Sequence, residues 1–324
     1  FYAFIYMLYG FGLILKSEKP FYVAIFFVIF FVSIRYMVGW DYEHYYNAVA
    51  FHVDNNITMR GEYLTILIVE LSRYFEAPLL YFSINALVLF FSMCHFIKKY
   101  SVNYWLSFFI FLGFPLFFLN SLSVVRIFSA VAIVIFAVDY LTKNKLSLYF
   151  VLVLIASLFH KSAVFAFIFP VFLFYKPSRQ TWIFLIVLAP FFEGIIKQII
   201  LFVVDSYLPL YSNYLKPTDV QEGTRAIYVF LVVAVAMIVM KNRVVDNNKL
   251  ELFYHIYLFG VFFYCIFISY GTLGHRLSLY STIFMLILLP KLVTIFKPII
   301  FQYGITTLIH LAFLIFFFLT LYIG

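Results

Sequence analysis

The 324-residue chain is too apolar to be a soluble protein. Hydrophobic residues make up 66% of it, charged residues only 11%, and the mean hydropathy is +1.05. A soluble domain carries about 25% charged residues, so this chain cannot cover itself with polar surface. Its net charge of +8 comes from basic residues scattered between apolar runs. That scatter argues against a nucleic-acid-binding surface and makes the basic residues topology signals instead.

The apolar runs predict an all-α polytopic membrane protein with about 12 transmembrane helices, since each span needs about 20 apolar residues. Helices are expected because lipid offers no water to satisfy exposed backbone groups. A single membrane-embedded domain, residues 1–324, is predicted, without a removable signal peptide. The expected spans lie near 1–15, 20–38, 78–97, 102–119, 124–142, 146–160, 161–175, 180–200, 225–241, 250–270, 275–290 and 298–322. The two spans between 146 and 175 are short, and are either tilted or re-entrant.

Lysines gather in alternate loops between the expected spans. Lys98 and Lys99, between the third and fourth spans, are one example. The positive-inside rule places these loops in the cytoplasm. Two long segments, about 39–77 and 201–224, then face outside together with both termini. Because every cytoplasmic loop is short, the chemistry is expected on the outer face.

Arginines follow the opposite pattern. Six of the eight lie at the outer ends of spans or in outer loops, namely Arg35, Arg60, Arg73, Arg126, Arg225 and Arg276. Arginine binds phosphate oxygens through paired hydrogen bonds and stays ionised when partly buried. The pattern therefore favours an anionic substrate, such as a lipid-linked pyrophosphate. The alternative is pairing with the acidic residues of the same face, which are Asp41, Glu43, Glu62, Glu70, Glu76, Asp205, Asp219 and Glu222.

The first long outer segment opens with aromatic and polar residues. They are Trp40, Asp41, Tyr42, Glu43, His44, Tyr45 and Tyr46. Rings at a span end form either an interfacial belt or a stacking platform for sugars, with carboxylates and histidine binding hydroxyls, and both readings stay open. Further on, the run EYLTILIVELSRYFEAP predicts an amphipathic helix that lies on the outer surface or dips into a cavity.

Two further positions carry charge within or between apolar runs. Arg126 lies one turn into an expected span, where a charge costs about 3 kcal/mol even on the milder scales. It should therefore face a cavity and have a partner, and the alternative is snorkelling to the outer interface. His160 and Lys161 lie between two short spans. Neutral histidine can act as a base or bind a hydroxyl there, protonated histidine can bind phosphate, and a hydrogen-bonded structural histidine is the alternative.

Three more residues are candidates for phosphate binding. His275 and Arg276 follow two glycines at the mouth of a span, where the backbone can approach a ligand, and Arg225 begins another span. The sequence has no Cys–His or acidic pattern with metal-ligand spacing and no phosphate-binding glycine loop. Neither a metal nor another cofactor is expected, so the substrate should bring its own activated leaving group.

Taken in order, these segments resemble the EpsG-like branch of the Wzy family, the O-antigen and capsule repeat-unit polymerases of bacteria. The matching segments are Arg35 with VGWDYEHYY, the EYLTILIVELS helix, Arg126 in SVVRIFSAVAI, KNKLSLYF leading to FHKSAVFAF, and HRLSLY. The resemblance covers about residues 30–285 and rests on order and spacing. The VR segment followed by FHKSA is its most specific part.

The resemblance implies a glycosyltransferase of the bacterial inner membrane, similar in architecture to the GT-C enzymes, with its active site facing the periplasm. Such enzymes transfer a growing glycan from undecaprenyl pyrophosphate to a new lipid-linked repeat unit, without a metal. The expected partners are the lipid-linked donor and acceptor glycans, membrane lipid, a chain-length regulator and a flippase, but no nucleic acid.

The same reading gives the candidate residues their roles. Arg126 and Arg276, with Arg225, would hold the pyrophosphate, while His160 is the first choice of base and Asp41 or Glu62 the next. The other expected substrate contacts are His275, Lys161, Arg35, Trp40, Tyr42, His44 and Tyr45.

Three other functions fit parts of the pattern. A flippase or transporter for lipid-linked sugars also needs a cationic cavity, but the sequence shows no internal repeat. An O-antigen ligase uses the same donor and passes the glycan to the lipid A core. An acyltransferase would share outer histidine and arginine, yet it would open to a cytoplasmic acyl donor, for which the cytoplasmic loops look too bare.

Overall fold

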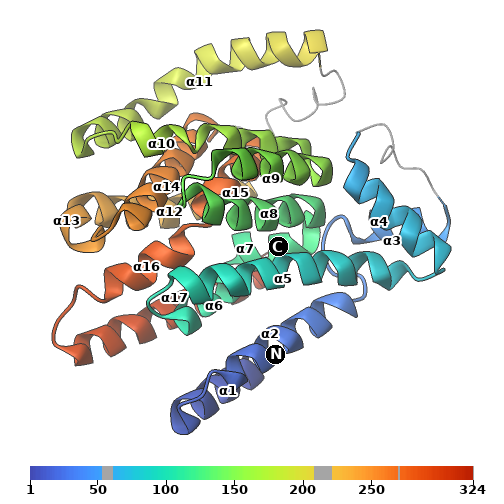
Figure 1. The fold of residues 1–324 in the computed structure, drawn as a ribbon, viewed down its shortest axis with the longest axis horizontal. Coiled ribbons are helices and arrows are strands. Elements are labelled where there is room, and N and C mark those ends of the chain that lie inside the picture. Colours follow the sequence, from blue (N-terminus) through green and yellow to red (C-terminus); the bar gives the residue numbers. More distant parts are fainter. Residues whose placement is uncertain (53–60, 208–220, 269–270, 324) are drawn as a thin grey trace. The chain divides into compact units, whose positions relative to one another are not determined.

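The described part of the chain is helical and contains no strand in the computed structural model (Figure 1). It comprises residues 1–52, 61–207, 221–268 and 271–323. The chain divides into two compact units, the first formed by Phe1–Val164 with Ile300–Gly324 and the second by Phe165–Ile299. The predicted all-α class is confirmed. The prediction of one domain stays a prediction, and each unit is described by itself.

The first unit contains ten of the helices, with the last one returning from the end of the chain. They are α1 (Tyr2–Leu15), α2 (Lys19–Ser33), α3 (Tyr42–Ala50), α4 (Tyr63–Tyr74), α5 (Pro78–Tyr100), α6 (Tyr104–Gly113), α7 (Pro115–Ser123), α8 (Val125–Leu141), α9 (Leu146–Phe159) and α17 (Ile299–Ile323). Local sequence explains several starts. Pro78 and Pro115 each occupy a first helical position, where the missing N–H is not needed. Asn103 caps α6 by accepting a 3.0 Å hydrogen bond from the Leu106 N–H.

The second unit is built around the apolar helix α14 (Asn248–Ile266). Its helices are α10 (Val171–Phe174), α11 (Arg179–Tyr207), α12 (Gln221–Val239), α13 (Lys241–Val244), α14 (Asn248–Ile266), α15 (Gly271–Thr282) and α16 (Met285–Val293). Helix α14 contacts most of the others and is buried along most of its length. At Gly260 it meets α15 so closely that a Cβ would lie 2.5 Å from the Cβ of Ser281.

Within the described residues, four helices are long and apolar enough to cross a membrane, and up to six spans result if each bent pair counts as one. The four are Pro78–Tyr100, Arg179–Ile196, Asn248–Ile266 and Ile299–Tyr322. One bent pair joins α6 to α7 at 63°, and the other joins Gly274–Thr282 to Met285–Val293 at 53°. Most of the other expected spans are helices of 10–17 residues. The chain is thus a helical membrane protein, whereas the predicted number of twelve spans is not confirmed.

Helix α2 is shorter than the expected span 20–38, and an arginine explains why. The α-helix ends at Ser33, and the Arg35 side chain folds back to donate hydrogen bonds to main-chain carbonyls. Nη1 donates to Val32 at 2.9 Å and Nε donates to Val38 at 3.2 Å. These bonds satisfy carbonyls that a longer helix would have used itself.

A glycine fixes the segment that leads from α2 to α3. Gly39 has φ +102°, and a Cβ on it would lie 2.2 Å from the carbonyl oxygen of Leu122 at the end of α7. The next residue, Trp40, donates its N–H to the Ser123 hydroxyl at 3.2 Å. Arg35 Nη2 also donates to the Leu122 carbonyl, at 3.1 Å. The chain is therefore held against α7 just before α3 begins.

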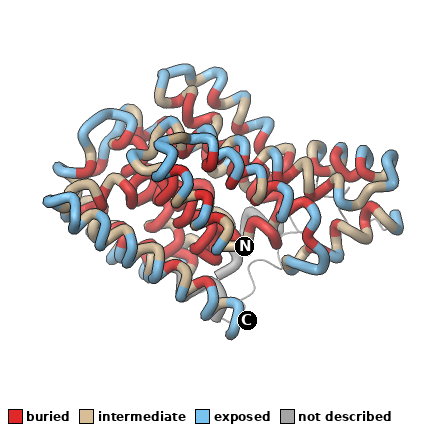
Figure 2. The backbone as a smooth tube through the Cα atoms, turned by 90° about the horizontal axis from the view of Figure 1, so that it is seen from below, coloured by how far each residue is buried: buried red, intermediate tan, exposed pale blue. Residues whose placement is uncertain are grey.

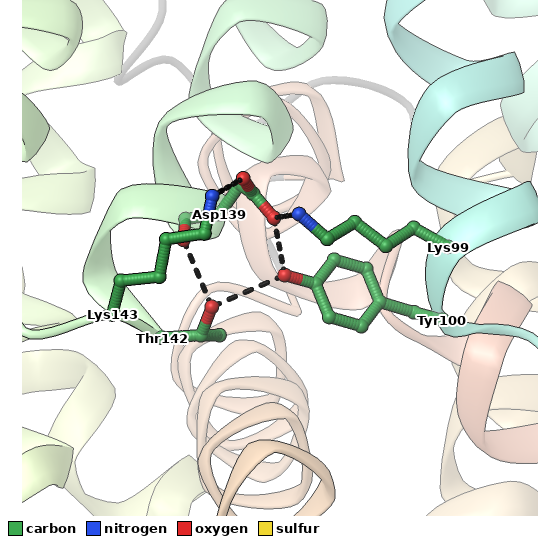
Figure 3. Close-up of polar contacts among 5 residues, drawn as sticks. All are labelled: Lys99, Tyr100, Asp139, Thr142 and Lys143. Atoms are coloured by element: carbon green, nitrogen blue, oxygen red, sulfur yellow. Dashed lines mark hydrogen bonds and ion pairs between the residues drawn. The ribbon is translucent and has the colours of Figure 1, made fainter.

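Helices α5 and α8 lie side by side and run in the same direction, with polar contacts at both ends. Near their first turns Ser129 donates to the Asn85 amide oxygen at 2.6 Å. At their last turns the Asp139 carboxylate binds Lys99 and accepts from the Tyr100 hydroxyl at 2.5 Å (Figure 3). Lys143 adds an ion pair to the same carboxylate at 2.7 Å.

Acidic side chains of the second unit also meet lysines of loops expected to face the cytoplasm. Lys291 lies 2.5 Å from Asp246, and its hydrogen bond holds the pKa of that carboxyl below the ordinary range. Glu251 lies 2.5 Å from Lys176 and 3.8 Å from Lys241. In each unit, lysines near helix ends thus form ion pairs with carboxylates.

Burial follows the pattern of a helical membrane protein. Helix α8 is buried on nearly every side, while α2 and α17 expose one large apolar face each. In Figure 2 buried residues (red) line the inner sides of the helices, and exposed residues (pale blue) line the outer sides. Exposed apolar faces of this extent are expected where lipid is the solvent.

Substituting Gly39 with alanine should destabilise the protein by about 2–3 kcal/mol, because the new Cβ clashes with the Leu122 carbonyl and φ is positive. Thermal unfolding of the purified protein in detergent measures the effect. Gly10, in the middle of α1, is the matched control, since a Cβ there meets nothing within 4 Å. Gly10→Ala should leave the midpoint unchanged or raise it. Equal midpoints for the two variants would contradict this account of Gly39.

Candidate functional site

Four side chains from four segments of the first unit meet in a polar cluster, which consists of Tyr45, Glu62, Arg126 and His160. Tyr45 lies on α3, Glu62 directly precedes α4, Arg126 lies in the first turn of α8, and His160 directly follows α9. All four are buried, with Glu62 fully inaccessible and Arg126 only 6% exposed. All four are candidates predicted from separate parts of the sequence, and the fold brings them together.

Arg126 is the centre of the polar cluster. Its Nη1 forms an ion pair with Glu62 Oε2, and its Nε donates a hydrogen bond to the Tyr45 hydroxyl at 2.5 Å. The prediction that Arg126 has a partner is therefore confirmed, and the partner is one of the acidic residues proposed as the alternative to an anionic substrate. Arg73 likewise pairs with one of them, at 2.6 Å from Glu70.

Helix geometry makes the carboxylate of Glu62 necessary. Arg126 is the second residue of α8, where the positive end of the helix dipole opposes a cation. A buried guanidinium at this place also loses its hydration, which is costly unless a counter-ion replaces it. Glu62 supplies that charge. Tyr45, whose ring stacks on Tyr81 at 4.8 Å between centroids, supplies a neutral acceptor.

His160 stands where α9 stops, in an extended conformation before a 3-10 helix, Lys161–Ile168. Its Nδ1 accepts the Ser162 N–H at 3.3 Å and lies 2.6 Å from the Ser162 hydroxyl. A ring nitrogen that accepts carries no proton, so in the neutral ring Nε2 holds it. Nε2 points to Glu62 Oε1, 3.7 Å away. The arrangement orients the imidazole toward the carboxylate.

Two nearby contacts position the first turn of α4. Thr65 donates its hydroxyl to the Phe159 carbonyl at 3.0 Å, which ties α4 to the end of α9. Gly61 has φ +63°, and a Cβ there would lie 3.6 Å from Lys161 Nζ. Lys161 therefore lies beside the residue that precedes Glu62. The polar cluster and Lys161 together carry two cations against one carboxylate, an excess that suits an anionic ligand.

The other candidates near α3 differ in position. His44 packs its ring edge-on against Tyr45 at 5.3 Å, close to the polar cluster. Asp41 occupies the N-cap position of α3 and is partly exposed. Tyr42 is buried and stacks on Phe82 at 4.8 Å, which is a packing role, whereas Trp40 is 80% exposed. The substrate contacts predicted for these residues stay predictions.

Arg35 is buried in a different environment. Its guanidinium lies 4.4 Å from the centre of the Phe82 ring and donates to three carbonyls, as described above. It also borders a small cavity that Asn85, Ser121 and Ser129 line. This geometry favours a structural role over the predicted substrate contact.

The remaining candidates belong to the second unit. His275 and Arg276 lie on α15, His275 buried and Arg276 partly exposed. Gly274 allows α15 to approach Phe267, whose Cβ and carbonyl oxygen would each lie 2.9 Å from an added Cβ, so here the close approach is to protein. The Arg225 side chain falls outside the described residues, as does Arg60. The roles predicted for His275, Arg276 and Arg225 stay predictions.

Sequence reasoning missed two features of the first unit. Asp139 was not singled out, although an acidic residue in the last turn of an apolar span was a visible signal. The Asn85–Ser129 pair carried no such signal, because amides and hydroxyls are common in spans. Among the residues that the structure describes, no group of three or more His, Cys, Asp or Glu is placed to hold a metal ion.

The fold and the polar cluster define a class: a helical membrane protein with a buried arginine, carboxylate and histidine at the ends of its helices. The comparison with known families is more specific. The EpsG family model matches residues 19–324, and the chain belongs to the EpsG family. Membership gives it a role like that of a membrane polysaccharide polymerase. No curated protein and no solved structure matches the chain.

Removing either charge of the central pair should destabilise the protein strongly. We expect Glu62→Gln and Arg126→Gln each to cost about 3–5 kcal/mol, because each leaves a buried charge unpaired. The double variant should cost less than the sum of the two. Unfolding midpoints in detergent measure the coupling.

The pair Glu70–Arg73 is the matched control, because the Glu70 side chain is 54% exposed. Glu70→Gln should cost only about 0–1 kcal/mol. If Glu62→Gln were as mild as Glu70→Gln, the central pair would not hold the site together.

Proposed function

We propose that this member of the EpsG family is a membrane glycosyltransferase that polymerises undecaprenyl-pyrophosphate-linked repeat units into O-antigen or a related surface polysaccharide. In this proposal the enzyme has a GT-C-like architecture, needs no metal, and works on the periplasmic face of the bacterial inner membrane. The observation that carries it is the buried pair of Arg126 and Glu62, with His160 facing Glu62 and Lys161 beside the residue before it. Family membership supports the reaction class.

Arg126 is proposed to bind the donor pyrophosphate. In the free protein the Arg126 guanidinium forms an ion pair with the Glu62 carboxylate. A pyrophosphate oxygen competes for the same guanidinium and carries more charge, so Arg126 would move from the carboxylate to the phosphate when donor binds. Lys161 adds a second cation nearby. The phosphate contacts predicted for Arg276 and Arg225 belong to the second unit and stay predictions.

When the Arg126 side chain moves to the phosphate, Glu62 becomes a stronger base. A carboxylate paired with arginine is a weak base, and its basicity rises when the cation leaves. Because Nε2 of His160 holds the proton in the neutral ring, Glu62 fits the role of base better than the histidine does. His160 then orients the carboxylate, and Asp41 remains a more distant alternative.

The proposed reaction is one displacement at the anomeric carbon of the donor glycan. The acceptor hydroxyl oxygen forms the new bond to that carbon, and its proton passes to Glu62. The bond between the carbon and the pyrophosphate oxygen breaks, and its electron pair leaves with undecaprenyl pyrophosphate, where Arg126 stabilises the charge. Exposed aromatic rings such as Trp40 are proposed to contact the sugars.

The test is an assay of purified protein in lipid with the lipid-linked repeat unit, with products separated by size. Wild type should give a ladder. Arg126→Lys, which keeps the charge but loses the paired donors, should be slower by about 10²–10³-fold, in line with the loss of a charge-stabilising donor. Arg243→Gln is the control, because Arg243 is exposed outside the polar cluster, and it should give the wild-type ladder.

Other outcomes select the rival functions. Transfer of labelled repeat unit across the bilayer without a ladder would favour a flippase. A product formed only when lipid A core is added would favour an O-antigen ligase. No ladder from folded wild type with its native repeat unit would overturn the polymerase proposal.

A further inference from the structure

The inner face of helix α4 (Tyr63–Tyr74) is mixed, with Ile68 and Val69 buried beside two hydroxyl side chains. Its buried residues include the hydroxyl side chains of Thr65 and Ser72, and Glu62 precedes it on the same side. Both hydroxyls are satisfied within the protein, Thr65 by the Phe159 carbonyl and Ser72 by the Ile68 carbonyl at 2.7 Å. This face packs on α3, α5 and α9.

The opposite face of α4 is exposed and mostly apolar, with Glu70 also on it. Along it lie Tyr63, Leu67, Leu71 and Tyr74, followed by Phe75, with exposed fractions between 42% and 82%. Their spacing of three or four residues puts them on one stripe of the helix. A helix on a water-exposed surface instead has mainly polar residues on its outer face. The sequence predicted an amphipathic helix here, and the structure shows which way it faces.

Helix α4 directly precedes a helix that can span a bilayer. Three residues separate Tyr74 from Pro78, where α5 begins, and α5 is long and apolar enough to span a bilayer. Exposed side chains of α5, such as Leu87 and Phe91, face outward as lipid-contacting residues of a span do. Helix α4 therefore packs on a helix whose own exposed face suits lipid.

The charges of α4 lie where they suit a lipid interface. Glu70 and Arg73 pair at 2.6 Å in its last two turns, and Arg73 also donates to the Ala48 carbonyl at 2.8 Å. Its first two turns expose only Tyr63 and Leu67. Paired charges at one end and aromatic residues along the stripe are typical of a helix between headgroups and acyl chains.

We propose that the exposed stripe of α4 lies against the acyl chains of membrane lipid, at the depth of the headgroup boundary. Helix α4 is then the wall between lipid and the polar cluster, since Glu62 and Thr65 are on its inner side. A lipid-linked substrate could reach the cluster past this helix directly from the membrane. The contact with lipid goes beyond the polymerase proposal and holds whether or not that proposal does.

The test measures the surroundings of position 67 in proteoliposomes. Leu67→Cys, in a background with Cys94→Ser and Cys265→Ser, carries an environment-sensitive fluorophore. Two quenchers are compared: a phospholipid with a nitroxide near the ester end of its acyl chain, and iodide in water. Phe91→Cys on α5 is the lipid-facing control, and Lys145→Cys in the turn after α8 is the water-facing control.

The lipid nitroxide should quench the label at position 67 at least about twofold more than the label at 145, and iodide should quench it less, because an interfacial helix buries its apolar face in the acyl boundary. Strong quenching by iodide alone would place the stripe in water. Quenching by neither would show that protein, including a second copy of the chain, covers it. Either of these results overturns the proposal without affecting the ladder assay.

Discussion

The buried ion pair between Glu62 and Arg126 determines how one end of the first unit is built. Neither residue can be buried alone, because each would lose its hydration without a counter-charge. The pair therefore requires Glu62, directly before α4, to reach the first turn of α8. Tyr45 on α3 and His160 after α9 then complete the surroundings of the two charges. An ion pair of this kind adds little stability over an apolar core, but it keeps an arginine available for an anion.

The two ends of α8 are charged in different ways. At the end that carries Asp139, the carboxylate meets Lys99 and Lys143, whose side chains are partly exposed. At the other end, Arg126 is enclosed and shares its charge with a fully buried carboxylate. Thirteen residues of helix put about 20 Å between the two clusters. Lysine at one end and buried arginine at the other fit the proposed orientation, with the chemistry at the arginine end.

Much of this could be predicted from the sequence, for physical reasons that differ between residues. A cation in an apolar span needs a partner, so the buried, paired state of Arg126 was predictable, but which of eight acidic residues pairs with it depends on the fold. His160 was predicted between two short spans, and it lies at such a break. The boundary of α2 was not predictable, because hydropathy does not record that Arg35 turns back to cap the helix.

The sequence could not predict which candidates distant in the chain lie close together in the fold. His275 and Arg276 lie in the second unit, and nothing in their local sequence fixes their distance from Arg126. Composition alone does not assign a role to each ring of the aromatic segment. Tyr42 packs on Phe82, whereas Tyr45 accepts a hydrogen bond from Arg126. Both rings are buried on α3, and the neighbours that α5 and α8 present to them decide between the two uses.

Binding of a short-chain polyprenyl pyrophosphate tests the central claim most directly, because it isolates the proposed contact from catalysis. Affinity would be measured by calorimetry for wild type and for Glu62→Gln, with the matching monophosphate as a second ligand. If Arg126 must leave Glu62 to bind phosphate, removing the competing charge should tighten pyrophosphate binding by about tenfold, or about 1.4 kcal/mol, provided that the variant is folded. Unchanged or weaker binding by folded Glu62→Gln would contradict the account.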